Sequence, residues 1–82
     1  MKIRIHPHAK ERMAERGATE AEVVATIETG ERFLAKFGRT GFRRNFLFDS
    51  DRHGRRYGTK QVEAYAAEED GWLVITVLVK YF

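Results

Sequence analysis

The chain of 82 residues lacks several features that define common classes of small proteins. It has no cysteine, which excludes disulfide bonds and thiolate zinc sites and is typical of a reducing compartment. No hydrophobic stretch is long enough to cross a bilayer, and the first residues are too polar for a secretory signal. A second hydrophobic core would need about 50 residues of its own. We therefore expect a cytoplasmic protein that forms a single domain over residues 1–82, with no membrane partner.

Motifs of well-known catalytic sites are also missing. The sequence contains no glycine-rich phosphate loop, no serine nucleophile motif and no paired-carboxylate signature. His6 and His8 flank the single proline, Pro7, but no further metal ligands lie nearby in the sequence. We accordingly predict neither a metal site nor a cofactor.

The charge is small in total and uneven along the chain. The net charge is +3, yet residues 31–60 carry nine basic and three acidic side chains, and residues 61–82 carry one basic and four acidic ones. A basic segment of this kind is expected where a protein binds a polyanion, of which nucleic acid is the commonest. A solvated basic loop explains the same pattern equally well.

Two helices are predicted near the N-terminus. Pro7 suits the first turn of a helix and Gly17 suits its end, which predicts a helix over residues 7–16. Thr19 and Glu22 have the spacing of a capping box, so a second helix should begin there and end at Gly30. The two helices should form a hairpin.

Strands are predicted on both sides of the helices. Residues 2–5 alternate between polar and apolar, which indicates a short edge strand. Alternation then predicts strands over 31–37, 43–49 and 60–67. Residues 49–58 are polar, charged and punctuated by glycine, so we predict a mobile loop there.

The last strand is the most apolar part of the chain. Nearly every residue from Trp72 to Val79 is apolar and most are β-branched, which predicts a central strand covered on both faces. The predicted order is β-α-α-β-β-β-β. Two helices packed on a curved, mainly antiparallel sheet make an α+β domain. The second face of the last strand then needs a cover, either from sheet curvature or from a partner subunit.

Three basic residues share one side of the first predicted helix. At 100° per residue, His8, Arg12 and Arg16 form a single ridge beside the buried positions Ala9 and Met13. An imidazole titrates near neutral pH and can act as acid or base, while arginines can hold a phosphate. These three are the candidate catalytic residues. In the alternative, His8 caps the helix and the arginines pair with Glu11, Glu15 or the acidic turn.

A second group of candidates lies in the basic segment. Arginines can contact phosphates, and Tyr57 can stack on an unpaired base. The candidate RNA-binding residues are Arg43, Arg44, Arg52, His53, Arg55, Arg56, Tyr57 and Lys60.

The helical hairpin also carries a family signature. A His-Ala pair at residue 8, an Arg-Met pair at residue 12 and an Arg-Gly pair at residue 16 precede the capped second helix. This signature resembles that of a small bacterial family, domain of unknown function 4258. That family is similar in topology to the RelE-like and BrnT-like toxins, small ribonucleases that cut RNA without metal and are neutralised by an antitoxin.

The resemblance implies a RelE-like fold and a toxin-type domain that binds RNA or the ribosome, with an antitoxin as protein partner. It leaves open whether the domain is an enzyme. The activity would be metal-independent RNA cleavage, with His8 as acid or base and Arg12 and Arg16 as clamps. The alternative function is a catalytically silent module for protein interaction or homodimerisation.

Overall fold

The computed structural model describes residues 2–82, and its elements follow the predicted order. The helices are α1 (Pro7–Arg16) and α2 (Glu20–Thr29), and a short 3-10 helix, η1, spans Lys36–Gly38. The strands are β1 (Ile3–Ile5), β2 (Glu31–Leu34), β3 (Thr40–Arg52), β4 (Arg55–Glu68) and β5 (Trp72–Tyr81). They form one open sheet in the order β1-β5-β4-β3-β2, in which only β1 and β5 are parallel. The α+β fold class is therefore confirmed.

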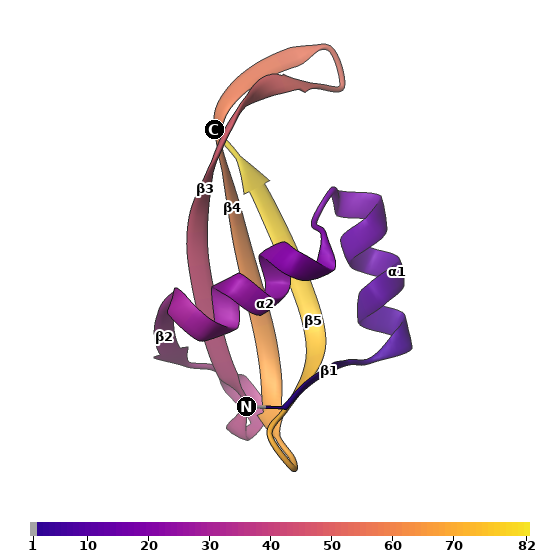
Figure 1. The fold of residues 1–82 in the computed structure, drawn as a ribbon, viewed down its shortest axis with the longest axis vertical. Coiled ribbons are helices and arrows are strands. Elements are labelled where there is room, and N and C mark those ends of the chain that lie inside the picture. Colours follow the sequence, from indigo (N-terminus) through magenta and orange to yellow (C-terminus); the bar gives the residue numbers. More distant parts are fainter. Residues whose placement is uncertain (1) are drawn as a thin grey trace.

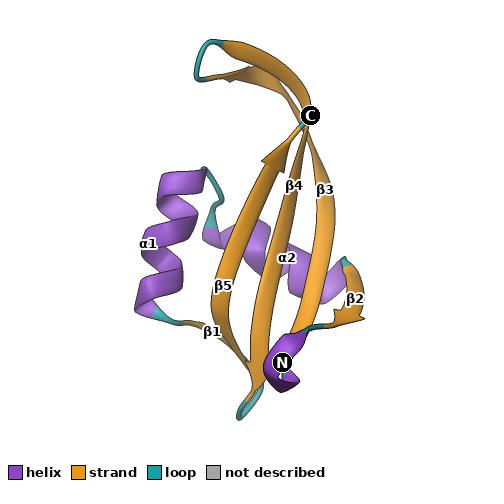
Figure 2. Ribbon diagram, turned by 180° about the vertical axis from the view of Figure 1, so that it is seen from behind, coloured by secondary structure: helices purple, strands orange, loops and turns teal. Residues whose placement is uncertain are grey.

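Both helices lie on the same side of the sheet (Figures 1 and 2). Helix α1 packs along β5, and α2 crosses β4 and β3. The opposite side, which we call the helix-free face, is formed by the alternate residues of the strands. Gly41, Tyr65 and Thr76 are paired across β3, β4 and β5 on this face. The domain therefore has one covered and one uncovered sheet surface. No helix among residues 2–82 is long and apolar enough to span a membrane.

Local signals determine both helices. Gly17 ends α1 with a φ of 86°, a left-handed conformation that glycine adopts at little cost. The predicted capping box is present at the start of α2, where the Thr19 hydroxyl accepts from the Glu22 N–H and the Glu22 carboxylate accepts from the Thr19 N–H. Both helices have the predicted bounds.

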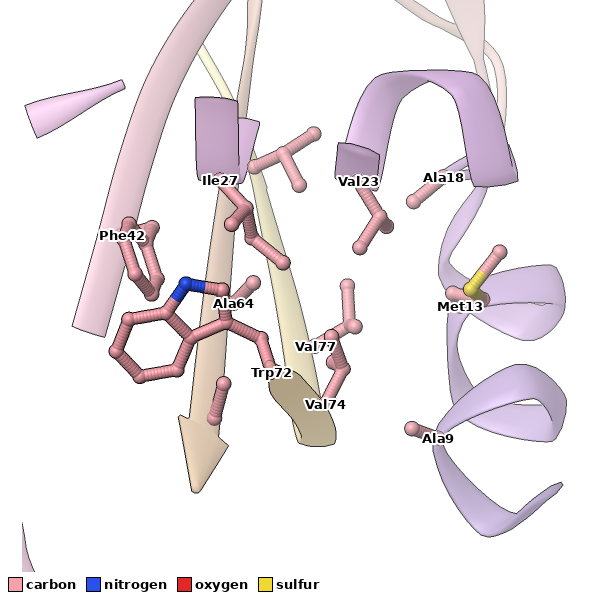
Figure 3. Close-up of a cluster of buried hydrophobic side chains, with 12 residues drawn as sticks. Ala9, Met13, Ala18, Val23, Ile27, Phe42, Ala64, Trp72, Val74 and Val77 are labelled. Atoms are coloured by element: carbon pink, nitrogen blue, oxygen red, sulfur yellow. The ribbon is translucent and has the colours of Figure 1, made fainter. Parts of the chain in front are cut away.

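The hydrophobic core lies between the helices and the sheet (Figure 3). The helices contribute Ala9, Met13, Ala18, Val23 and Ile27, and the strands contribute Phe42, Val62, Ala64, Ala66, Trp72, Val74 and Val77. The rings of Phe42 and Trp72 meet edge to face, with centroids 5.2 Å apart. Fully burying one valine side chain stabilises a fold by about 1.5–3 kcal/mol relative to leaving it exposed, so this cluster is the main source of stability.

The prediction of a mobile loop over residues 49–58 is wrong. Strand β3 continues to Arg52 and β4 begins at Arg55, so the segment is a hairpin that projects beyond the rest of the sheet and curls over (Figure 1). His53 and Gly54 form its turn with φ values of 53° and 80°. Positive φ at both central residues matches the twist of a two-residue β-hairpin. We call Asp49–Gly58 the distal hairpin.

The first predicted strand after the helices is shorter than expected. Strand β2 ends at Leu34, and η1 replaces the rest of the alternating segment. Phe37 has a φ of 62°, a left-handed conformation that is rare for a bulky residue. The alternation of Phe33, Ala35 and Phe37 continues in the sequence after the strand has ended.

The last strand lies inside the sheet but is not its central strand, contrary to prediction. Strand β4 is at the centre of the sheet, and β5 lies between it and the short β1. Leu73 and Leu78 pair with Ala67 and Glu63 on the helix-free face, where both leucines are half-buried. Within residues 2–82 no helix covers this face of β5, and the two leucines are only partly exposed.

Candidate functional site

The three candidate catalytic residues on α1 have different surroundings. His8 is exposed in the first turn, where its backbone N–H donates to Nδ1 of His6, so His6 rather than His8 caps the helix. Arg12 is exposed and pairs with Glu15 at 3.4 Å. Arg16 is half-buried and donates through Nη1 to the backbone oxygen of Val77, 2.6 Å away. The ridge exists, but Arg16 is bonded to the sheet.

Arg16 has a structural role at the edge of β5. Strand β1 pairs with β5 only from Trp72 to Val74. Beyond that point α1 lies beside β5, and the Arg16 guanidinium supplies a hydrogen bond where no strand does. Removing the partner of a partly buried carbonyl would lower the free energy of unfolding by about 1–3 kcal/mol.

Three side chains from the sheet donate to the last carbonyl groups of α1 and its Gly17 cap. Arg52 donates to the backbone oxygen of Glu15 at 3.0 Å, Tyr81 to that of Arg16 at 2.7 Å, and Lys60 to that of Gly17 at 2.9 Å. These carbonyls have no partner within the helix, and cations are favourable at this end of the helix dipole. Two candidate RNA-binding residues, Arg52 and Lys60, thus hold the helix onto the sheet.

Lys60 also forms the most buried ion pair among the described residues. Its Nζ lies 2.8 Å from the Glu22 carboxylate, and its side chain is 9% exposed. Burial raises the pKa of Glu22, but the hydrogen bonds from Lys60 and from the Thr19 N–H outweigh it and leave that pKa below its ordinary value. The pair connects the start of α2 to β4.

The distal hairpin brings the other predicted residues together. Tyr57 packs near Tyr81, with centroids 5.7 Å apart, and the Arg55 guanidinium lies 5.7 Å from the centre of the Tyr57 ring. Arg56 donates to the Asp49 carboxylate at 2.8 Å. His53 and Arg55 are exposed, and within residues 2–82 neither forms an ion pair. The hairpin therefore presents an arginine, a tyrosine and a histidine on one projection.

Arg43 and Arg44 lie on opposite faces of β3. Arg44 is on the helix side, where it donates to the Thr29 hydroxyl at 3.1 Å. Arg43 is on the helix-free face, where it bonds Glu31 at 2.9 Å and Glu63 at 3.3 Å. The hydrogen bond with Glu31 raises the pKa of Arg43. The structure thus does not bring the eight candidate RNA-binding residues onto one surface.

A charged cluster that the sequence pattern did not indicate lies at the middle of the helix-free face. The Glu63 side chain is only 4% exposed and is flanked by Arg43 and by Lys80 at 3.8 Å. Its Oε1 accepts from the Tyr65 hydroxyl at 3.0 Å. Burial and this hydrogen bond raise the pKa of Tyr65. Alternation along β4 correctly indicates the face on which Glu63 lies, but not that neighbours bury it.

The cluster borders a cavity of about 470 Å³ at the corner where β2 meets η1. Three aromatic residues, two aliphatic residues, two cations and a threonine line it: Phe33, Leu34, Ala35, Lys36, Phe37, Arg39, Tyr65 and Thr76. Within residues 2–82 no group of histidine and acidic residues is arranged to hold a metal ion.

These observations define a small α+β domain with basic residues on a projecting hairpin. A family model described as a domain of unknown function (DUF4258) matches residues 5–79, so the chain belongs to that family. No curated protein and no solved structure matches the chain.

Proposed function

We propose that this domain binds RNA and that the distal hairpin makes the main contact. The observation that carries the proposal is the placement of Arg55 beside Tyr57 on an exposed projection, with His53 at its turn. An unpaired base can stack on a tyrosine ring or a guanidinium plane, and arginine can bond the adjacent phosphate. The resemblance to RelE-like and BrnT-like toxins is consistent with this function, and RNA binding would place the protein in the cytoplasm.

Charge along the hairpin supports the same function. Arg56 is partly neutralised by Asp49 and Asp51, whereas Arg55 forms no ion pair among the described residues. Arg55 can therefore neutralise a phosphate without breaking an existing bond. Arg52 remains bonded to α1 and stacks at 4.8 Å from the Tyr81 ring, which holds the base of the hairpin in place.

The binding test compares two exposed cations in a fluorescence anisotropy titration with a single-stranded RNA. Arg55→Gln should weaken binding several-fold, and Tyr57→Ala should weaken it further if a base stacks there, because stacking contributes about 1–3 kcal/mol per base. Lys10→Gln removes an exposed cation on α1 and should change little. Equal effects of Arg55→Gln and Lys10→Gln would show that only net charge matters and would reject the hairpin site.

Cleavage is a further step of the same proposal, with His8 as acid or base and Arg12 as a phosphate clamp. Their exposure leaves both side chains accessible to a substrate. The test is RNA integrity in a bacterial host after induced expression of the wild type or His8→Ala at matched levels of folded protein. RNA fragments that accumulate only with the wild type would support cleavage. Intact RNA with both proteins would reject it and leave RNA binding as a separate question.

The second candidate function is a catalytically silent module that forms homodimers or binds another protein, such as an acidic antitoxin. The observation that favours it is a pair of exposed apolar side chains on the helix-free face. Leu47 is 90% exposed and Phe82 is 60% exposed. Leu47 is paired with Thr59 across β3 and β4, and Phe82, just after β5, exchanges two backbone hydrogen bonds with Thr59. Sedimentation of the wild type and of Leu47→Ser tests self-association. A monomer at all concentrations would exclude the dimer.

A further inference from the structure

The cavity at the corner of β2 and η1 is a second site, separate from the distal hairpin. It opens on the helix-free face, between Phe33 and Phe37 on one side and Tyr65 and Thr76 on the other. Its volume, about 470 Å³, is within the range of small-molecule sites, which is about 300–1,000 Å³. The cavity is large enough for one or two fused rings and a polar group.

Two aromatic residues of the cavity, Phe33 and Tyr65, pack against neighbouring groups. The Phe33 ring lies against Gly41, where an added Cβ would come 2.3 Å from the ring. It meets the Tyr65 ring edge to face, with centroids 5.9 Å apart. The Tyr65 hydroxyl is bonded to buried Glu63, which Arg43 and Lys80 flank. Glu63 is the buried charge of this network at 4% exposure, and its hydrogen bond orients the Tyr65 ring.

Two cations line the cavity without bonded partners. Among residues 2–82 neither Lys36 nor Arg39 forms an ion pair, whereas Arg43 and Lys80 nearby share Glu63. The Thr76 hydroxyl also lines the cavity and donates no hydrogen bond within the described residues. The side chains of Lys36, Arg39 and Thr76 are therefore free to bond a ligand.

The outer lip of the cavity is apolar and exposed. Leu34 is 94% exposed and Phe37 is 88% exposed, and Phe37 adopts a left-handed backbone conformation with a φ of 62°. Such a conformation costs about 1–3 kcal/mol and is often found at ligand sites. Phe37 lies in η1, between the end of β2 and the start of β3, and is part of the cavity lining.

We propose that this cavity binds a small ligand that carries a planar aromatic group next to an anionic group. The Phe33 and Tyr65 rings would contact the aromatic group, since aromatic pairs favour stacked or edge-to-face contacts. Arg39 and Lys36 would bond a carboxylate or phosphate, for which arginine offers paired donors and lysine a point charge. Two sources share this chemistry: a free aromatic acid, and a nucleotide with its base and phosphate. The site does not depend on RNA binding by the hairpin.

The experiment titrates the isotope-labelled full chain and follows its amide resonances. The probes are two matched pairs, indoleacetate with uncharged indoleacetamide, and adenosine monophosphate with uncharged adenosine. At least one anion should bind saturably and shift resonances of residues 33–39, Tyr65 and Thr76. Its uncharged counterpart should bind about tenfold more weakly, because charge-assisted bonds are lost. Tighter binding of adenosine monophosphate would identify a nucleotide, and tighter binding of indoleacetate a free aromatic acid.

Variants identify the groups responsible. The double variant Lys36→Gln with Arg39→Gln should remove the advantage of the anion over its uncharged counterpart. Lys10→Gln and Arg55→Gln should leave it unchanged, so that failure here is distinguishable from failure of RNA binding. The proposal is overturned if neither anion saturates below about 10 mM, or if the shifted resonances lie outside the cavity. Equal affinities for the charged and uncharged probes would also overturn it. That comparison uses the wild-type protein, so it does not depend on the folding of a variant.

Discussion

The Tyr81 hydroxyl donates to the backbone oxygen of Arg16, 2.7 Å away, and so joins the last strand to the end of the first helix. The same ring contacts Phe48 of β3, and Tyr57 and the Arg52 guanidinium of the distal hairpin. Tyr81 thus connects three parts of the chain that are far apart in sequence. Contacts with Tyr81, together with the turn at its tip, determine the position of the hairpin.

Removing this hydroxyl should weaken the fold measurably. We expect Tyr81→Phe to lower the free energy of unfolding by about 1 kcal/mol, because it leaves a helix-end carbonyl without its partner. The matched control is Tyr57→Phe, since the Tyr57 hydroxyl makes no hydrogen bond within residues 2–82. Urea denaturation of both variants and the wild type measures the difference. Equal stabilities of the two variants would contradict the role given to Tyr81.

The pH dependence of stability should report the ion pair of Glu22 with Lys60. Because folding lowers the pKa of Glu22, its carboxylate contributes stability that is fully present above its ordinary pKa of 4.5. That contribution is lost as the pH falls through the lower pKa of the folded protein. Unfolding free energies measured from pH 6 down to acid conditions should therefore decline less steeply for Glu22→Gln than for the wild type. If the unfolding free energies of the variant and the wild type declined equally, another carboxylate would cause the acid sensitivity.

Alanine substitutions at Gly41 and Gly58 compare the stability cost of a crowded position with that of an uncrowded one. Gly41→Ala places a methyl group within 2.3 Å of the Phe33 ring, and we expect a loss of about 1–3 kcal/mol from overpacking. Gly58→Ala meets nothing within 4 Å and should change stability little. Thermal unfolding followed by circular dichroism measures both. If Gly41→Ala were as stable as Gly58→Ala, the Phe33 ring would not be fixed against the strand.

Local signals made the helices predictable, and nonlocal contacts made the rest harder. Pro7, Gly17 and the capping box of Thr19 act within a few residues, so the bounds of α1 and α2 follow from the sequence. Alternation placed Val62 and Ala64 on one face of β4 and Glu63 on the other. The same pattern could not show which neighbours bury Glu63, because those neighbours come from β3 and β5.

Contacts between distant residues also explain the features that the sequence pattern did not indicate. Residues 49–58 have the composition of a loop, but Phe48 and Tyr57 reach the Tyr81 ring and stabilise a hairpin there. Arg16 has the spacing of a functional ridge, but the short length of β1 leaves a carbonyl of β5 for it to bond. Neither outcome can be read from a window of neighbouring residues. The cavity near Phe37 was missed because η1 interrupts an alternation that predicts a strand.

The salt dependence of RNA affinity tests the central claim most directly. If the distal hairpin binds phosphates, the logarithm of the affinity for a single-stranded RNA should fall linearly with the logarithm of salt concentration. Arg55→Gln should make that slope shallower by about 0.7, the value for one phosphate contact on a single strand. The Lys10→Gln variant should keep the wild-type slope. An affinity that does not change with salt, or identical slopes for all three proteins, would contradict RNA binding through this hairpin.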